Sequence, residues 1–588
     1  MAMELSLVSS LSLAVFLLSA LYVYLTTIRR SRSPKLRLPP SPPGWPVIGH
    51  LHLLSDMPHH AMAELARTMR APLLAMRLGS VPAVVISKPE LARAALTSND
   101  AALASRPHLL SGQFLSFGCS DVTFAPAGAY HRMARRVVVS ELLSARRVAT
   151  YGAVRVKELR RLLAHLTKNT SPANAIDISE CFLNLSNDVL CRVAFGRRFP
   201  HGEGDKLGAV LAEAQDLFAG FTVGDYFPEL EPFASTVTGL RRRLKRCLAD
   251  LREVCDEIVD EHISGKRQRV AGDDREEDFV DVLLRVQKSA GLEVPLTDDN
   301  LKALVLDMFV AGTDTSFATL EWVMTELVRH PRVLAKAQSE VRRVVASSGN
   351  GNNTTVDESH LGELHYMRAI IKETFRLHPA VPLLVPRESV SACVLGGYDI
   401  PAKTRVFINT FAMGRDPEVW GEDVLTFSPE RFEVAAGAGG EIDLKDPDYK
   451  LLPFGGGRRG CPGYTFALAT VQVSLASLLY HFDWALPAGS RVLREEEEEE
   501  ESKGLLCRRV QSVKSNIISV VGLRFKPIND PSMCEQRPEE RHQLAAAGDG
   551  LGVPVQVLRW SDQFDHPLER CFPGRTEDAT SALQDVPV

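Results

Sequence analysis

The chain has 588 residues, of which 45% are hydrophobic and 24% charged, with a formal net charge of −5. This composition is that of a globular protein with a large core, and the lack of a basic excess argues against nucleic acid as a partner. The ten cysteines include no C-x-x-C pair, which argues against a zinc site or a disulfide framework and fits a reducing compartment.

The N-terminal segment predicts a membrane anchor. Residues 5–28 carry no charge and are numerous enough to span a bilayer. Basic residues follow this run rather than precede it, at Arg29, Arg30, Arg32, Lys35 and Arg37. The order disfavours a secretory signal and places the chain after residue 28 in the cytoplasm. We therefore expect a single-pass anchor over residues 1–28, with a buried core helix as the alternative.

A short spacer and a hairpin follow the anchor. Residues 29–44 are basic and then proline-rich, and prolines stiffen a linker because they fix φ. Residues 72–87 alternate around Gly79 and Ser80, which predicts a β-hairpin. Most of the remaining chain is patterned as long amphipathic helices. The predicted fold class is mostly α with a smaller β region.

Two segments before residue 140 are candidates for a site. Residues 106–124 predict a loop rich in Phe and Leu, including Phe114 and Phe117, and these aromatics belong either to a pocket or to the core. Residues 130–136 predict a basic helix that carries His131 and Arg135. A solvated helix face is the alternative for these charges.

A long helix is predicted over residues 300–329 and ends before Pro331. It contains Ala311 and Gly312, which have almost no side chain, followed by the carboxylate of Asp314 and the hydroxyl of Thr315. Such a sequence leaves room beside the helix and offers a path for protons. The alternative is a structural Thr315 that donates to its own i−4 carbonyl.

Asp307 is unexpected in so apolar a helix. At 100° per residue it shares a face with Ala311 and Thr315. A buried carboxylate needs a partner. Two partners stay open, namely the backbone amides of the 106–124 loop and the ammonium group of an amine substrate.

Three elements follow in the C-terminal half. Glu373 and Arg376 lie three residues apart on one helix face, and residues 429–432 add Arg431. Residues 378–387 predict an extended strand. Residues 454–463 form a glycine-rich loop around Cys461, before an apolar run over 464–484 that predicts a buried helix. Glycines and a helix N-terminus favour a thiolate, and a lone thiolate suits haem iron. The alternative is a buried free cysteine.

The pattern F-x-x-G-x-R-x-C-x-G over 454–463 resembles the haem loop of the cytochromes P450. The E-x-x-R, P-E-R-F and 311–316 elements stand in that family's order, and residues 34–488 resemble plant members of the group that includes the 71 family. The resemblance implies the P450 fold, haem b with Cys461 as axial iron ligand, and monooxygenation with O2. Electrons would come from NADPH through NADPH-cytochrome P450 reductase, at the cytoplasmic face of the endoplasmic reticulum membrane.

The resemblance also implies residue roles. Thr315 and Asp314 would be catalytic. Glu373, Arg376 and Arg431 would form a structural triad behind the haem. Substrate-lining positions would be Asp307, Phe114, Phe117, Ala380 and Leu384. Haem contacts would fall on Cys461, Arg135, Arg459, Phe454, Gly455, Gly463, Ala311, Gly312, Arg387 and His131. His131 departs from the family, which has tryptophan there, but an imidazole still donates to a propionate.

The likeness further implies hydroxylation of a small aromatic amine, with another small plant aromatic or a terpenoid as the alternative substrate. It ends near residue 489, so the expected domains are the anchor, the spacer, a haem domain over 45–489 and an atypical tail over 490–588. Seven glutamates occupy positions 495–501, and the later composition predicts disorder. We interpret the tail as a retained intron or a shifted reading frame in the gene model, with a real acidic extension as the alternative. A tail that replaces the family's C-terminal β-hairpin would give a haem-binding but catalytically impaired protein.

Overall fold

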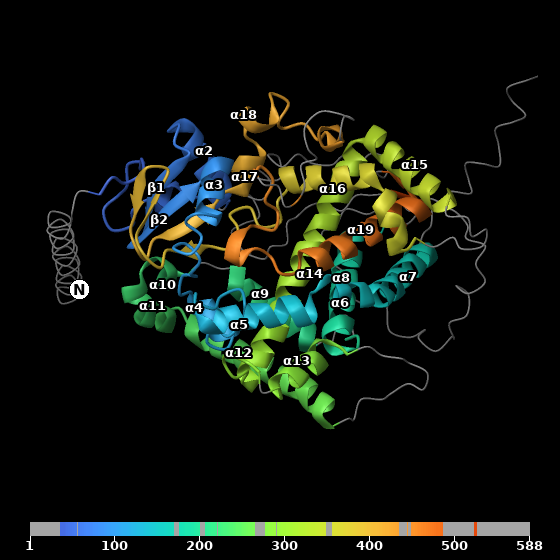
Figure 1. The fold of residues 1–588 in the computed structure, drawn as a ribbon, viewed down its shortest axis with the longest axis horizontal. Coiled ribbons are helices and arrows are strands. Elements are labelled where there is room, and N and C mark those ends of the chain that lie inside the picture. Colours follow the sequence, from blue (N-terminus) through green and yellow to red (C-terminus); the bar gives the residue numbers. More distant parts are fainter. Residues whose placement is uncertain are drawn as a thin grey trace, which may run out of the picture.

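The computed structural model describes residues 36–55, 57–169, 176–199, 206–219, 222–264, 277–289, 291–347, 356–433, 444, 448–485 and 522–525. The predicted anchor, most of the basic spacer and most of the tail lie outside these residues. The described chain is mostly helical, with a small sheet region at one end of the molecule (Figure 1). The predicted fold class is confirmed.

The main sheet has four strands in the order β1-β2-β6-β3. Strands β1 (Leu73–Leu78) and β2 (Val81–Ile86) form the predicted hairpin, and β2 pairs in parallel with β6 (Arg405–Ile408). Strand β3 (Arg387–Glu388) completes the sheet against β6. The turn needs Gly79, which has φ +63°, because a Cβ there would lie 2.5 Å from the Tyr226 carbonyl oxygen.

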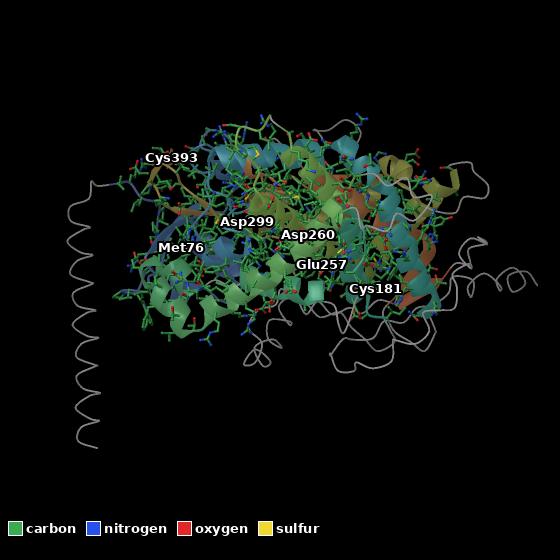
Figure 2. The ribbon with its side chains drawn as sticks, turned by 90° about the horizontal axis from the view of Figure 1, so that it is seen from below. Met76, Cys181, Glu257, Asp260, Asp299 and Cys393 are labelled. Atoms are coloured by element: carbon green, nitrogen blue, oxygen red, sulfur yellow. The ribbon has the colours of Figure 1, made fainter. Side chains whose placement is uncertain are left out.

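Helix α14 (Asp298–Arg329) runs through the centre of the helical region and packs along α8 (Ile178–Phe195) (Figure 1). The side chain and backbone of Thr297 and Asn300 cap each other at its start, which extends the predicted helix by two residues. Arg252 of α12 (Leu240–Ser264) donates to Asp299 at 2.7 Å and fixes the first turn; Asp299 is labelled in Figure 2. Among the described residues, α14 alone is long and apolar enough to cross a membrane, and 56% of its most apolar window is buried inside the protein.

Helices α16 (His365–Leu377) and α19 (Tyr464–His481) pack against α14 and complete the core. The apolar run predicted as one helix ends at His481, and β7 (Phe482–Ala485) follows. The other helical segments of the described chain are η1 (Leu51–Leu53), α2 (Pro58–Thr68), α3 (Pro89–Leu96), α4 (Leu110–Leu115), α5 (Ala129–Val137), η2 (Val138–Leu142), α6 (Ala145–Thr150), α7 (Gly152–Asn169), α9 (Lys206–Ala219), α10 (Val223–Tyr226), η3 (Pro228–Leu230), α11 (Glu231–Val237), α13 (Phe279–Gln287), α15 (Pro331–Ser347), η4 (Glu358–Glu363), α17 (Thr410–Gly414), α18 (Pro417–Trp420), η5 (Pro429–Phe432) and η6 (Gly457–Arg459).

Two local predictions are wrong. The 106–124 segment contains the short helix α4 instead of a continuous loop. The 378–387 segment is strand only from Arg387, because its prolines lack N–H donors and Leu384 closes a turn by donating to the Val381 carbonyl. Leu384 accordingly has φ +50°.

Two further sheets have two strands each. Strand β4 (Cys393–Leu395) pairs with β5 (Tyr398–Ile400), and β7 pairs antiparallel with β8 (Gly522–Phe525). Strand β8 lies inside the tail for which the sequence predicts disorder. At these four residues the structure therefore differs from the prediction, because the exposed edge of β7 accepts a strand from the tail.

Candidate active site

The loop around Cys461 is shaped by its glycines. The Cys461 N–H donates to the Phe454 carbonyl at 2.8 Å, and Gly455 and Gly457 both have φ +62°. A Cβ on Gly457 would lie 2.5 Å from Asp100 Oδ1. The loop therefore needs glycine at this position for both conformation and space. The Phe454 ring packs against Phe375 of α16 at 5.4 Å between centroids, which ties the loop to the core.

Cys461 lies deep in the fold. Burial raises the pKa of its thiol, while a backbone hydrogen bond from Gly463 and the charge of Arg135 lower it. The side chain is nevertheless accessible, and so is Ala311 in the middle of the otherwise buried α14. Asp307, one turn before Ala311, also acts on the thiol through its charge, so α14 lies across from the loop. From the exposure of these two residues in largely buried surroundings, we infer a space between the cysteine loop and α14, called the hollow below.

Cationic side chains gather beside this hollow. Arg387 donates to Asp100 at 2.9 Å and to the Gly456 carbonyl, and Arg135 donates to the Gly460 carbonyl at 2.7 Å. Burial and then the neighbouring arginines, Arg387 first, lower the pKa of Arg459 to about 10. This excess of positive charge favours an anionic ligand.

His131 belongs to the same cluster. Burial first, and then the surrounding arginines, lower its pKa to about 3. Its Nε2 is buried and has no hydrogen-bond partner among the described residues. A propionate of haem b would satisfy this nitrogen and offset the arginine charges. The thiol, the hollow and the cationic cluster therefore fit the haem that the sequence implies.

The sequence did not single out Arg106, which joins this cluster. Its Nη1 donates to the carbonyls of Val385 and Pro386 at 2.6 and 2.9 Å, and its Nε donates to the Thr123 carbonyl. Burial and the charges of Arg459 and Arg387 lower its pKa. An arginine at the head of an apolar loop was the available signal.

Arg459, predicted as a haem contact, also holds the backbone of distant segments. Its three nitrogens donate to the carbonyls of Ala104, Val122 and Ala125 at 2.7, 3.1 and 2.6 Å. The guanidinium thereby joins the cysteine loop to the segments on both sides of α4.

Gly312, Asp314 and Thr315 of α14 lie in different environments. The Thr315 hydroxyl donates to the Ala311 carbonyl at 2.9 Å, which is the structural role predicted as the alternative to catalysis. The hydroxyl is still accessible. A Cβ on Gly312 would meet Leu190 of α8 at 2.9 Å, so this glycine allows α8 and α14 to approach closely. Its contact with the haem stays a prediction.

Asp314 accepts a hydrogen bond of 2.9 Å from Gln215 Nε2 on α9. Burial raises the pKa of Asp314 to about 6, partly opposed by this hydrogen bond. A carboxyl group with such a pKa changes its protonation near neutral pH, which suits a proton donor.

Asp307 holds the segment that follows α4, at Val122 and Thr123. Its Oδ2 accepts from the N–H groups of Val122 and Thr123 at 2.9 and 3.2 Å, and its Oδ1 accepts from Thr123 Oγ1 at 2.6 Å. Of the two predicted partners, the structure has the loop amides. Burial raises the pKa of Asp307 and these hydrogen bonds lower it.

The predicted substrate-lining residues differ in burial. Phe114, Ala380 and Leu384 are half-buried, and a Cβ on Gly455 would lie 3.5 Å from Leu384, so the 380–384 segment borders the cysteine loop. Phe117 is a core residue with the Arg252 guanidinium 5.0 Å from its ring centre. Of the two alternatives for this aromatic residue, a pocket or the core, the structure has the core for Phe117.

Phe124 was not singled out from the sequence. Its ring stacks on Phe218 of α9, with centroids 5.2 Å apart and an interplanar angle of 3°. The stack joins the segment after α4 to α9 by an aromatic contact.

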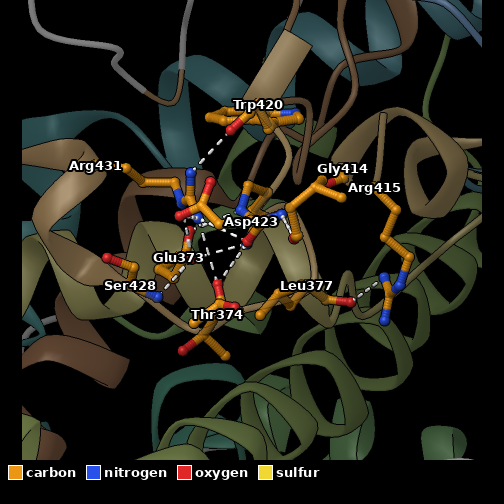
Figure 3. Close-up of polar contacts among 12 residues, drawn as sticks. Glu373, Thr374, Leu377, Gly414, Arg415, Trp420, Asp423, Ser428 and Arg431 are labelled. Atoms are coloured by element: carbon orange, nitrogen blue, oxygen red, sulfur yellow. Dashed lines mark hydrogen bonds and ion pairs between the residues drawn. The ribbon is translucent and has the colours of Figure 1, made fainter. Parts of the chain in front are cut away.

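The predicted triad forms around the buried carboxylate of Glu373 (Figure 3). Arg376 donates to both carboxylate oxygens of Glu373, and Arg431 Nε donates to Glu373 Oε1 at 3.0 Å. Arg376 also donates to the Gly414 and Val424 carbonyls, each at 2.6 Å. The triad thereby fixes α16 to the segment over residues 414–431.

The profile of the family described as Cytochrome P450 matches residues 39–511. The chain therefore belongs to the cytochrome P450 family, whose members are haem-dependent monooxygenases. It is 83% identical over 510 residues to "Tryptamine 5-hydroxylase" of Oryza sativa subsp. japonica, covering 86% of this chain and 95% of that protein. It is 46% identical over 479 residues to "Cytochrome P450 71AP13" of Prunus mume, covering 81% and 88% of the two chains.

A zebra fish cytochrome P450 solved with abiraterone shares the fold, with a TM-score of 0.59 and 22% identity. The match covers 74% of this chain and 94% of that chain. The family profile extends beyond residue 489, where the sequence resemblance was expected to end.

Proposed function

We propose that this monooxygenase hydroxylates tryptamine at the indole 5-position and forms serotonin, a plant secondary metabolite. The observation that carries the proposal is the 83% identity over 510 residues to the rice protein named for that reaction. One oxygen atom of O2 enters the ring, the other leaves as water, and NADPH with one proton supplies the reducing equivalents.

Haem b, when bound, supplies the oxygen-activating chemistry. Cys461 would hold its iron, and the cationic cluster of Arg106, His131, Arg135, Arg387 and Arg459 would hold its propionates. The small side chain of Ala311 would leave space for the haem beside α14. Asp314 holds a proton that it exchanges near neutral pH, and the accessible hydroxyl of Thr315 passes a proton into the hollow.

The proposed pocket suits a flat aromatic ring. Phe114 and the Phe124–Phe218 stack offer aromatic surface, and Leu384 adds an apolar contact. Asp307 is not assigned to the ammonium group, because loop donors bond both of its oxygens. Asp307 therefore positions the wall of the pocket.

We further propose a single-pass endoplasmic reticulum membrane protein with a cytoplasmic haem domain, anchored by residues 1–28. Exposed apolar side chains lie near the start of the described chain, at Trp45, and on η3 and α11, at Leu230, Phe233 and Val237. These segments adjoin through the β1–β2 turn, since Arg77 donates to the Trp45 carbonyl and the Ser80 N–H donates to the Tyr226 carbonyl. Membrane lipid would cover this apolar side.

The proposed electron donor is NADPH-cytochrome P450 reductase. Arg132 and Arg136 are exposed on α5, and Arg458 is exposed in the cysteine loop. These side chains would attract an acidic flavoprotein surface. No nucleic acid enters the proposal.

Another small plant aromatic or a terpenoid is the second candidate substrate, supported by the 40% identity to "Premnaspirodiene oxygenase" of Hyoscyamus muticus. A haem-binding but impaired protein is the third candidate, because the chain after residue 489 replaces most of the expected hairpin. Strand β8 restores one edge of that region.

The test uses membranes that contain the full chain and a plant reductase. A thiolate-type band in the reduced, CO-bound spectrum and a low-to-high-spin shift with tryptamine support the first candidate. A thiolate band with a shift for terpenoids alone supports the second. Activity that appears only after deletion of residues 490–588 supports the third.

A further inference from the structure

Helix α14 carries two carboxylates on one face. Asp307 and Asp314 are seven residues apart, which is two helical turns. Asp307 holds the backbone of Val122 and Thr123, and Asp314 accepts from Gln215 of α9. Each carboxylate therefore ties α14 to a different element beside the pocket.

These two elements also contact each other. Phe124, next to Thr123, stacks on Phe218, which lies three residues after Gln215 on α9. The contacts thus form a closed circuit from Asp307 through the loop to Phe124, then across α9 to Gln215, and back to α14 at Asp314. A shift of α9, or of the loop that stacks on α9, would therefore change the hydrogen bond between Gln215 and Asp314.

We propose that Gln215 is a positioning residue that holds Asp314 oriented for proton exchange with the pocket, and that this hold depends on the position of α9. The inference rests on the acid role of Asp314 in the proposed function. The amide N–H is a donor at every pH, so it prefers the carboxylate form of its partner. The proton that Asp314 gives to the pocket returns to it from solvent.

The side-chain amide of Gln215 is the main polar group that acts on the Asp314 carboxyl group. Among the described residues, Asp314 makes no ion pair, and burial and Gln215 are the causes of its shifted pKa. The facing helix α8 contributes the neutral Asn187, whose side chain accepts from the adjacent Thr313 at 3.5 Å. Elsewhere on α9, Leu211, Ala214 and Leu217 are buried, and the charged Glu213 and Asp216 pair with Arg243 of α12 at 2.5 and 3.8 Å rather than with Asp314.

The first readout is independent of turnover. In the haem-loaded protein, hydrogen exchange of the α9 amides, corrected for intrinsic rates, should be about fivefold faster at pH 5 than at pH 7.5, because protonation of Asp314 weakens a charge-assisted hydrogen bond. The step should be centred near pH 6. It should vanish in Gln215→Leu and in Asp314→Asn, and it should persist in the control Ala212→Gln, which alters an exposed position of the same helix.

The second readout is the product formed per NADPH consumed. Gln215→Leu should lower it about fivefold at pH 7.5, while Ala212→Gln should not change it. The double variant with Asp314→Asn should be no worse than Asp314→Asn alone, because both remove one interaction. A wild-type protein without the pH step, or a Gln215→Leu variant that keeps it, overturns the proposal. A wild type that shows the step but does not hydroxylate tryptamine refutes the proposed substrate and leaves the role of Gln215 intact.

Discussion

Arg376 donates to both carboxylate oxygens of Glu373, at 2.7 and 2.8 Å, and both side chains are fully buried. Arg431 and the Ser428 N–H add two more donors to the same carboxylate. A buried anion is thus surrounded by donors from two separate segments, and this arrangement is stable only when it is complete.

Loss of the Glu373 charge should destabilise the whole haem side of the protein. Glu373→Gln leaves two buried guanidinium groups without their anion, which costs about 3–5 kcal/mol. Thermal unfolding and haem content per protein should both fall. Glu64→Gln removes an exposed pair with Arg67 and serves as the control that should change neither. Normal haem content in Glu373→Gln would contradict the structural role of the triad.

The cysteine loop should not tolerate a side chain at Gly457. Gly457→Ala combines a positive φ with a Cβ 2.5 Å from Asp100, so it should lose most of the thiolate-type band. Gly460→Ala is the matched control in the same loop, because Gly460 has φ −58° and a Cβ there would lie 3.4 Å from the nearest atom, the Gly457 carbonyl oxygen. Equal spectra for the two variants would show that the loop is less constrained than the geometry requires.

The two roles considered for Asp307 predict different substrate dependence. If Asp307 only holds the loop, Asp307→Asn should weaken the binding of tryptamine and of the neutral 3-methylindole by the same factor. If Asp307 pairs with the ammonium group, only the binding of tryptamine should weaken, by tenfold or more, since a charged hydrogen bond is worth about 1.5–3 kcal/mol. Spin-state titrations measure both affinities. Hydrogen exchange of residues 120–125 should be faster in the variant in either case.

Arg106 should contribute to haem retention although it is absent from the sequence motifs. Arg106→Met removes a charge and three hydrogen bonds to the backbone, so transfer of haem to an excess of apomyoglobin should be about tenfold faster. Arg106→Lys keeps the charge but lacks the planar fork, and its rate should fall between those of Arg106→Met and the wild type. An unchanged rate in Arg106→Met would remove Arg106 from the haem-binding cluster.

The sequence predicted the fold class, the Glu373 triad and the cysteine loop because each depends on a contiguous pattern of residue types. Glycines around one cysteine, or a carboxylate and a guanidinium one helical turn apart, determine their local geometry with little help from the rest of the chain. The predicted hairpin over 72–87 was correct for the same reason.

Contacts between distant segments were less predictable. Gly312 also lets α14 pack closely on Leu190 of α8, a contact that its place beside Ala311 does not indicate. The partner of Asp307 lies about 185 residues earlier in the chain, and helical periodicity gives a face but no partner. Phe124, Arg106 and Gln215 act through such distant contacts, and only Arg106, at the start of an apolar segment, has a local signal in the sequence.

The most direct test of the central claim is identification of the product that the full chain forms from tryptamine in membranes with reductase, NADPH and isotopically labelled O2. The account predicts serotonin that carries one labelled oxygen atom, and no product from Cys461→Ser in the same membranes. A chain that shows the thiolate-type band but forms no 5-hydroxylated product would contradict it.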